Sequence, residues 1–426
     1  MNPDFSSRFS FDDDAHDTAL IRVIGVGGGG GNAVNNMLAK GIHGVEFAAV
    51  NTDAQALQAN GAPTKIQMGR ELTKGLGAGA RPSVGADAAK ESHREIEAAL
   101  DGADMVFVAA GMGGGTGTGA APVVAALAKQ MGILTVAVVT KPFQAEGRKR
   151  LKMAEQGIDQ LREVVDTLII IPNERLLDVA EDHTTLVEAF EMADDVLYNA
   201  TRGISELITV HGLINLDFAD IRTTMLDGGT ALMSSAIASG DRRAERAAQE
   251  AISSPLLDGI SIAGARNVLV NITAGIDLGV REATQATSVI QQEAGDDAEV
   301  IFGTVIDESL GDSLRVTVIA TGFDQSGPKE VAAEAVRRTS VTLGPSYGAP
   351  HYKGEDNLKV LDEPAFERRR PTPERLEDEP RPRAERADEG ARPQNVRRLP
   401  ASDVPRRERI NKDDSDVPAF LRRMMD

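Results

Sequence analysis

Glycine-rich segments with interleaved hydroxyl residues are the part of this sequence best suited to chemistry on an anionic ligand. The segment Gly113–Gly119 reads GGGTGTG, follows the apolar run Asp104–Ala110 and precedes the apolar run Ala120–Ala128. That order predicts a strand, a loop and a helix. Glycines let the backbone approach a ligand closely, and a helix N-terminus offers unpaired N–H groups and a positive dipole end. The segment predicts a di- or triphosphate site, because a flexible linker would not lie between a buried strand and an apolar helix.

A second glycine segment, Gly25–Asn32, follows the first predicted strand and opens the first predicted helix. Its glycines at 25, 27 and 30 satisfy the pattern GxGxxG, and Asp53 lies 23 residues beyond the last of them, which alone favours a dinucleotide site and a dehydrogenase. Two glycine segments after two different strands, however, suit one triphosphate held from both sides. The pattern GxxxxGK[ST] does not occur, so a Walker P-loop is excluded.

Two further features are candidates for contacts with phosphate and ribose. The segment Gly75–Ala80 is a third glycine loop that could close on the terminal phosphate, or form a surface turn. Glu146 and Arg150 follow the strand that ends at Thr140 and lie four residues apart, which places them on one helical face if a helix forms there. Glu146 could accept from ribose hydroxyls and Arg150 could bind a phosphate, although an ordinary surface ion pair has the same spacing.

A long helical pattern carries the candidates for base recognition. Phe190 and Asp194 lie four residues apart, so a base could stack on the ring while the carboxylate accepts from N1–H and N2–H₂ of guanine. Adenine offers no such pair of donors, so an acid here favours guanine. A core position for Phe190 is the alternative reading, and Asp195 is a second candidate for the carboxylate.

The segment Asn215–Asp220, which reads NLDFAD, places Asp217 and Asp220 three residues apart. Carboxylates can orient and polarise a water for attack on a phosphate. These two lie a helix length from the glycine segments, and two acids beside their own triphosphate would repel it. We therefore expect them to act on the nucleotide of a second copy of the chain, where Mg²⁺ offsets the charge; a helix cap or a solvated pair is the alternative.

The elements that must position these residues alternate between strand and helix. Six runs in the first half read as strands buried on both faces: 20–26, 45–51, 65–68, 104–110, 133–140 and 167–171. Helical patterns are expected at 32–40, 86–100 and 121–131, followed by a helix of about 25 residues after Thr185. In the last part of this region, helices are expected at 242–252 and 283–293 and strands at 267–273, 299–305 and 314–321. The fold class is α/β: a doubly wound, mainly parallel, Rossmann-like sheet, a long central helix and a smaller mixed α/β domain.

Composition separates this folded part from two flanking segments. Residues 326–426 hold 12 of the 19 prolines, and their 21 basic and 20 acidic residues give a net charge of +1. Since the whole chain carries −19, residues 1–325 carry −20. We expect a disordered acidic arm (1–18), a nucleotide-binding domain (19–183), the central helix (184–211), a C-terminal α/β domain (212–325), a disordered linker (326–410) and a terminal peptide (411–426).

Charge and residue content exclude several functions. An acidic chain with no Trp and three Tyr is unsuited to nucleic acid, and the absence of Cys excludes disulfides and thiolate metal sites. No apolar run approaches the roughly 20 residues that a membrane helix needs, and residues 1–17 lack the features of a signal peptide. We expect a cytoplasmic protein that reaches a membrane only through a partner.

Taken together, these motifs resemble the FtsZ family of bacterial, tubulin-like cell-division GTPases. The segment GGGTGTG matches the signature of the tubulin superfamily, and the similarity continues through residues 20–325 in 26–32, 51–57, 139–143, 215–220 and 252–257. The resemblance implies GTP and GDP as ligands, Mg²⁺ on the phosphates rather than on protein side chains, hydrolysis of GTP, and head-to-tail filaments that form the cytokinetic ring at mid-cell beneath the membrane and recruit division proteins.

The resemblance also assigns the site residues. It implies that Asn215, Asp217 and Asp220 complete the active site of the adjacent subunit. The nucleotide-binding residues that it implies are Gly28, Gly29, Gly30, Gly31, Asn32, Asn51, Asp53, Gly79, Ala80, Gly113, Gly114, Gly115, Thr116, Gly117, Thr118, Thr140, Glu146, Arg150, Phe190 and Asp194.

The end of the chain resembles the family's docking peptide for membrane tethers and division regulators. The matching residues are Asp416–Arg423, which include the sequence PAFLRR. A near copy with the sequence PAFERR lies within Asp362–Arg369, where Glu367 stands in place of the apolar Leu421. This copy is either a chance repeat or a weak second docking site that raises avidity.

Overall fold

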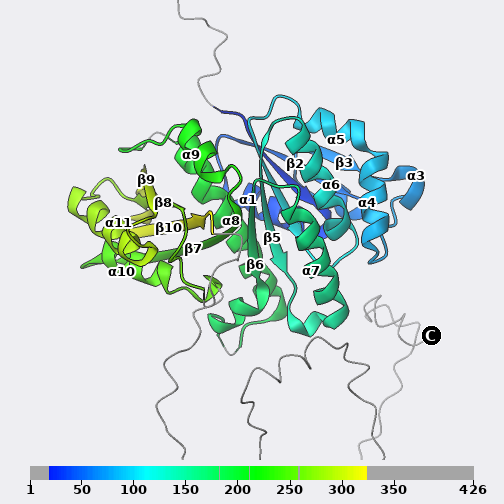
Figure 1. The fold of residues 1–426 in the computed structure, drawn as a ribbon. Coiled ribbons are helices and arrows are strands. Elements are labelled where there is room, and N and C mark those ends of the chain that lie inside the picture. The colour runs from blue at the N-terminus through cyan, green and yellow to red at the C-terminus, as the bar shows by residue number, and fades with distance from the viewer. Residues whose placement is uncertain (1–18, 182, 211, 258–259, 324–426) are drawn as a thin grey trace, which may run out of the picture. The chain divides into compact units, whose positions relative to one another are not determined.

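The structure is a computed structural model that describes residues 19–323 apart from 182, 211, 258 and 259 (Figure 1). The predictions for the acidic arm, the linker, the terminal peptide and its near copy lie outside the described residues.

A single ten-stranded sheet runs through the described part of the chain in the order β3-β2-β1-β4-β5-β6-β7-β10-β8-β9. The strands are β1 (Ile21–Val26), β2 (Val45–Asn51), β3 (Thr64–Gln67), β4 (Met105–Gly111), β5 (Leu134–Lys141), β6 (Thr167–Pro172), β7 (Gly229–Ser239), β8 (Asn267–Ala274), β9 (Glu299–Ile306) and β10 (Ser313–Thr321). All neighbours from β3 to β7 are parallel, β10 runs antiparallel to β7 and β8, and β9 is parallel to β8. The predicted doubly wound, mainly parallel α/β fold is confirmed.

The helices cover this sheet (Figure 1). They are α1 (Gly27–Lys40), α2 (Ala54–Ala59), α3 (Arg70–Thr73), α4 (Pro82–Glu91), α5 (His93–Leu100), α6 (Thr116–Gln130), α7 (Arg148–Arg162), α8 (Leu186–Thr209), α9 (Phe218–Met225), α10 (Arg243–Ile252) and α11 (Val280–Ala294), with 3₁₀ turns η1 (Gln144–Glu146), η2 (Asn173–Asp178), η3 (Pro255–Leu257) and η4 (Glu308–Leu310). The order of strands and helices at the carboxyl ends of β1, β4, β5 and β6 places several loops and helix N-termini together.

Four local predictions were wrong. Helix α1 begins at Gly27 instead of Asn32, and α6 begins at Thr116 instead of Ala121, so much of each glycine segment is the first turn of a helix. The expected helix 86–100 is two helices that break at Ser92, whose hydroxyl accepts the N–H of Gly69 (3.2 Å). Strand β7 was missed because its sequence, GTALMSSAIAS, is poor in the β-branched residues that indicate a strand.

The long helix α8 connects the two parts of the sheet. Thr185 and Glu188 form a capping box at its start, as the pattern TTLVE suggests. Its buried side chains share one core cluster with residues of β1, β4 and β5 and with residues of β8, β9 and β10. Leu186, the first residue of the helix, is exposed, and Phe190, for which a core position was the alternative, is 40% exposed. The division of the chain near residue 212 into two domains stays a prediction.

Candidate functional site

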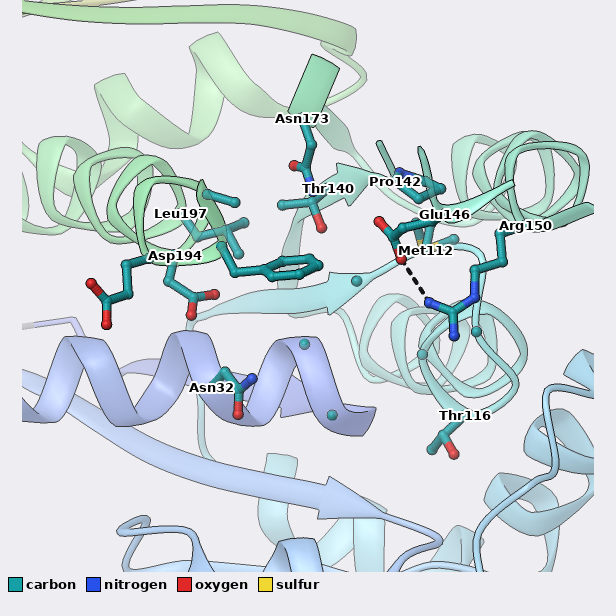
Figure 2. A pocket seen from close by; sticks show the side chains of 18 of the residues that line it. Asn32, Met112, Thr116, Thr140, Pro142, Glu146, Arg150, Asn173, Asp194 and Leu197 are labelled. Carbon is teal, nitrogen blue, oxygen red and sulfur yellow. Dashed lines mark hydrogen bonds and ion pairs between the residues drawn. The ribbon is translucent and has the colours of Figure 1, made fainter. Parts of the chain in front are cut away.

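A cavity of about 630 Å³ lies at the carboxyl ends of β1, β4, β5 and β6, beside the first half of α8 (Figure 2). This volume falls in the range of ordinary small-molecule pockets. The residues that line the cavity are Gly28, Gly29, Asn32, Gly111, Met112, Gly114, Gly115, Thr116, Gly117, Thr140, Pro142, Glu146, Arg150, Asn173, Val187, Phe190, Glu191, Ala193, Asp194 and Leu197. Figure 2 shows Thr116, Glu146 and Arg150 at one end and Asp194 at the other.

The N-termini of α1 and α6 form the glycine-rich end of the cavity. Both helices start without a side-chain cap and without an acid in the first turn, so their first N–H groups and positive dipole ends are not offset by a side chain. Gly28 and Gly114 face open space, since a Cβ on either would meet no atom within 4 Å. This end is suited to the oxygens of a polyphosphate.

Other glycines of the two segments serve packing. A Cβ on Gly30 would collide with the carbonyl oxygen of Ala109, and a Cβ on Gly117 would lie 2.5 Å from the carbonyl oxygen of Gly111. The helices therefore reach the sheet only because these positions lack a side chain.

Glu146 and Arg150 both line the cavity, but they do not share a helical face. Glu146 ends η1, Gly147 follows with φ of +101°, and Arg150 lies in the first turn of α7. The spacing suggested one helix because it could not reveal the sharp turn at Gly147. The two side chains still form an ion pair, Nη1 to Oε2, of 2.6 Å, and Glu146 also accepts the N–H of Phe143 (3.0 Å).

The opposite end of the cavity combines an aromatic ring with hydrogen-bond acceptors. The ring of Phe190 meets Phe143 edge to face, with centroids 5.5 Å apart. Burial, together with the nearby negative charges of Asp195 and Glu191, raises the pKa of Asp194 from 3.8 to about 7. Asp194 is thus poised to ionise when a ligand presents N–H donors.

Asp195 does not line the cavity, although it was the other candidate for base recognition. Its Oδ1 accepts from Asn36 (2.7 Å) and forms an ion pair with Lys40, both on α1. Adjacent side chains on an α-helix point about 100° apart. Asp194 therefore faces the cavity, while Asp195 connects α8 to α1.

Asn173 was missed, and its environment points to a ligand. It directly follows β6, its side chain is 4% exposed, and its Oδ1 has no hydrogen-bond partner. A buried acceptor without a partner costs roughly 1–3 kcal/mol, which a ligand donor would relieve. A polar residue immediately after a buried strand on the binding edge of the sheet was the signal that could have found it.

Several predicted residues lie next to the cavity and not in its lining. Thr118 accepts the N–H of Gly113 (2.9 Å) and so holds the loop. Asp53 caps α2 by accepting from Gln55 and Ala56, and the Asn51 side chain accepts the N–H of Asp53. Gly31 and Asn51 border a smaller cavity of about 40 Å³, and the segment that contains Gly79 and Ala80 packs against Gly115. The roles given to these residues and to Gly30 stay predictions.

Asp217 and Asp220 lie at the opposite end of the parallel strands from the cavity, near the amino end of β5. Both are exposed, and Asp217 is the N-cap of α9, because its Oδ1 accepts the N–H of Asp220 (2.8 Å). Asn215 accepts the N–H of Gly212 (2.6 Å). Arg222 of α9 donates to the carbonyl of Gly132, two residues before β5 begins, whereas residues that follow the carboxyl end of β5 line the cavity. The acids therefore do not reach the cavity of their own chain.

The described residues bring no three His, Cys, Asp or Glu side chains together as a metal site. Within the same residues, none of the helices has the length and apolar character that crossing a bilayer requires.

Comparisons with known proteins agree with this arrangement. Residues 20–181 match the Tubulin/FtsZ family, GTPase domain, and residues 229–324 match the FtsZ family, C-terminal domain. An empty FtsZ dimer of M. jannaschii is 44% identical, over 72% of this chain and 89% of that chain, with a TM-score of 0.69. A point mutant of the same FtsZ is 45% identical over 72% and 92%, also with a TM-score of 0.69. A GTPγS-bound CetZ2 protofilament from Haloferax volcanii is 23% identical over 73% and 95%, with a TM-score of 0.63, which indicates a shared fold.

Proposed function

The chain belongs to the tubulin/FtsZ family of GTPases, and on this premise we propose that it binds and hydrolyses GTP while assembling head-to-tail into filaments of the cell-division ring. The observation that supports the proposal is the separation of a glycine-rich cavity at the carboxyl ends of the parallel strands from two exposed carboxylates at their amino ends.

The pocket supports a guanine nucleotide. The polyphosphate lies along the glycine end, where the N-termini of α1 and α6 and the guanidinium of Arg150 supply positive charge and donors. The base lies toward Phe190, and two acceptors, Asp194 and Asn173 Oδ1, are available for the N1–H and N2–H₂ donors that guanine has and adenine lacks.

Mg²⁺ fits this site as a companion of the phosphates. Because the described residues gather no group of three His, Cys, Asp or Glu side chains, phosphate oxygens and water would supply the ligands of the ion there. When bound, the ion offsets charge that develops on the phosphates.

Hydrolysis then needs a second subunit. Asp217 and Asp220 of one subunit would meet the terminal phosphate in the pocket of the next, with Asn215 beside them, and orient the attacking water. The cap on α9 fixes the Asp217 carboxylate relative to the helix. A contact between two different edges is heterologous and does not close, so it generates a filament.

Exposed apolar side chains support contacts at both edges. Leu213 and Ile214, next to the acids, are 69% and 41% exposed. Val187 and Leu186, at the start of α8 beside the pocket, are each 67% exposed. Apolar surface of this kind on two opposite edges is typical of surfaces that become buried in an assembly.

We further propose that these filaments lie in the cytoplasm at the division site. The acidic body excludes nucleic acid as a general partner, and Asp416–Arg423 would dock membrane tethers and regulators, so the chain itself needs no membrane insertion.

Sedimentation and turnover test the proposal together. Protein at micromolar concentration is centrifuged with GTP and Mg²⁺, with GDP and without nucleotide, and GTP hydrolysis per molecule is measured over a range of protein concentrations. We expect pelleting with GTP and a rate per molecule that rises with concentration. A soluble protein with a concentration-independent rate would indicate a non-polymerising GTPase, and binding of NAD(H) in place of GTP would indicate a dehydrogenase.

A further inference from the structure

A groove of about 490 Å³ lies beside the nucleotide pocket, between the carboxyl ends of β5 and β6 and the start of α7. We call it the basic groove; its lining includes Lys141, Arg148 and Arg175, together with Gln144, Glu155 and Glu174. Lys141 pairs with Glu155 (3.1 Å) and Arg175 with Asp178 (3.5 Å), so Arg148 and the exposed cations beside it are the charges that an added anion would meet. Pro142 borders both this groove and the nucleotide pocket, so the two share one edge of the sheet.

The charge of the basic groove is unusual for its position. The start of α7 reads RKRLK, with no acid in the first turn, and its four cations are exposed. Of these, Arg148 lines the groove and Lys149 follows it, whereas Arg150 lines the nucleotide pocket and pairs with Glu146. Cations at a helix N-terminus oppose the dipole, so this run costs helix stability. Within the described residues, neither Arg148 nor Lys149 forms an ion pair. An exposed basic surface on residues 18–325, whose net charge is −16 (the −20 of residues 1–325 less the −4 of residues 1–17), favours an anionic occupant.

Residues 1–17 have the complementary charge. They contain five aspartates, at positions 4, 12, 13, 14 and 17, and one arginine, which gives a net charge of −4. The described chain starts beside Asp104, since Leu20 exchanges hydrogen bonds with Asp104 and the carbonyl of Asp104 accepts from Leu134. This is the amino end of β1, β4 and β5, and it is the edge at which α9 contacts Gly132.

We propose that the acidic arm of one subunit docks in the basic groove of the next subunit along the filament. The inference rests on the proposed head-to-tail contact, in which the α9 edge of one subunit meets the pocket edge of its neighbour. The arm therefore starts at the interface and needs to cross only the gap to a groove that borders the neighbour's pocket.

Chain length permits this contact. Eighteen extended residues reach about 60 Å. To dock in the groove of its own subunit, the arm would first have to run the length of β5, about 26 Å for its eight residues, and stay more extended. The shorter span gives the higher effective concentration, which favours the neighbour's groove.

Site-directed cross-linking tests the contact directly, because the chain contains no cysteine. One protein carries Asp13→Cys in the arm, and a second carries Gln144→Cys, an exposed position that lines the groove. The two are mixed with GTP and Mg²⁺, treated with a short bismaleimide and centrifuged. The control replaces the second protein with Glu71→Cys, an exposed position in α3 that follows β3 at the same edge of the sheet.

We expect a covalent heterodimer with Gln144→Cys that is at least fivefold more abundant than with Glu71→Cys and that is lost with GDP. Raising the salt to 0.5 M shortens the Debye length to about 4 Å and should reduce cross-linking per pelleted molecule. Equal cross-linking at both positions, or none at Gln144→Cys in samples that pellet, would overturn the docking while leaving assembly intact. Failure to pellet would instead contradict the proposed function.

Charge exchange gives a second measurement. Replacing the five arm aspartates with asparagine should raise the critical concentration for pelleting about three- to tenfold, as expected for two or three exposed ion pairs. A chain that combines lysines at the five arm aspartate positions with Arg148→Glu and Lys149→Glu should have a lower critical concentration than a chain with only the arm changes or only the α7 changes. Strict additivity of the two sets would show that arm and groove do not meet.

Discussion

Binding of guanine nucleotides should depend on pH through Asp194. In the nucleotide-free protein, burial and the charges of Asp195 and Glu191 raise the pKa of this carboxyl from 3.8 to about 7. Guanine N–H donors bind the ionised form, so a bound nucleotide lowers the pKa again. Affinity should therefore be gained as the pH rises through 7 and lost as it falls below 7.

The size of the effect follows from the ionised fraction. With a pKa of about 7, roughly nine-tenths of the Asp194 carboxyls are ionised at pH 8 and one-tenth at pH 6. Affinity should fall about tenfold over this range, or about 1.4 kcal/mol. Asp195→Asn removes one of the charges that raise the Asp194 pKa, so it should move the midpoint of this loss to lower pH.

Equilibrium titration with a fluorescent GDP analogue between pH 5.5 and 8.5 measures the effect. Because the phosphates of GDP also titrate, the same series is recorded for Asp194→Asn, which cannot ionise, and the two curves are compared. We expect the variant to bind more weakly at pH 8 and to show a flatter profile. Parallel profiles for both proteins would show that ionisation of the ligand, and not of Asp194, causes the pH dependence of affinity.

Three further outcomes are expected. The raised pKa of Asp194 means that its ionised form destabilises the empty pocket. Asp194→Asn should therefore stabilise the nucleotide-free protein by roughly 1–2 kcal/mol at pH 8, after allowance for solvent screening, with little gain at pH 4. Thermal unfolding at both pH values measures this difference. Gly28→Ala should fold normally but lose at least tenfold in nucleotide affinity by titration, because its Cβ enters open pocket space, whereas Gly61→Ala, away from the pocket, should bind as the wild type. Asp217→Ala should lower the free energy of unfolding by about 0.5–2 kcal/mol through the lost cap, whereas Asp220→Ala should not; both should bind GTP and lose turnover, and equal unfolding curves would contradict the capping role.

The buried strands and the long helix could be predicted because their patterns are local. Strand β4 is a continuous apolar run, and the capping box at Thr185 marks the start of α8. Strand β7 could not be recognised from Ser, Ala and Gly, because its pairing with β6 and β10 is decided by partners far away in the sequence.

The glycine segments illustrate what periodicity alone cannot resolve. Five consecutive glycines indicate a loop by intrinsic preference, yet Gly28 to Gly31 are helical, because contacts such as that of Gly30 with Ala109 compensate for the poor propensity. The residue types of the pocket could be predicted from the segments, but the separate roles of Gly28, which faces the cavity, and Gly30, which packs on the sheet, required the structure.

The candidate site was predictable where motifs carry it and not where only spatial position does. Asn173 has no neighbouring motif, and its importance depends on the missing partner of its Oδ1. Conversely, the spacing of Asp217 and Asp220 suggested both a cap and catalysis; the cap is present, and the distance from the pocket follows from the place of α9 at the other edge of the sheet.

Mixing two inactive variants shows whether one subunit completes the active site of the next. Gly28→Ala keeps its carboxylates but binds GTP at least tenfold more weakly, so its pocket stays largely empty at a GTP concentration that fills the pocket of Asp220→Ala. Asp220→Ala binds GTP but lacks a catalytic acid. At equal total protein, we expect the mixture to hydrolyse GTP faster than either variant alone. The GTP-filled pocket of Asp220→Ala then meets the intact Asp217 and Asp220 of Gly28→Ala. A mixture no more active than the mean of its components would contradict this expectation.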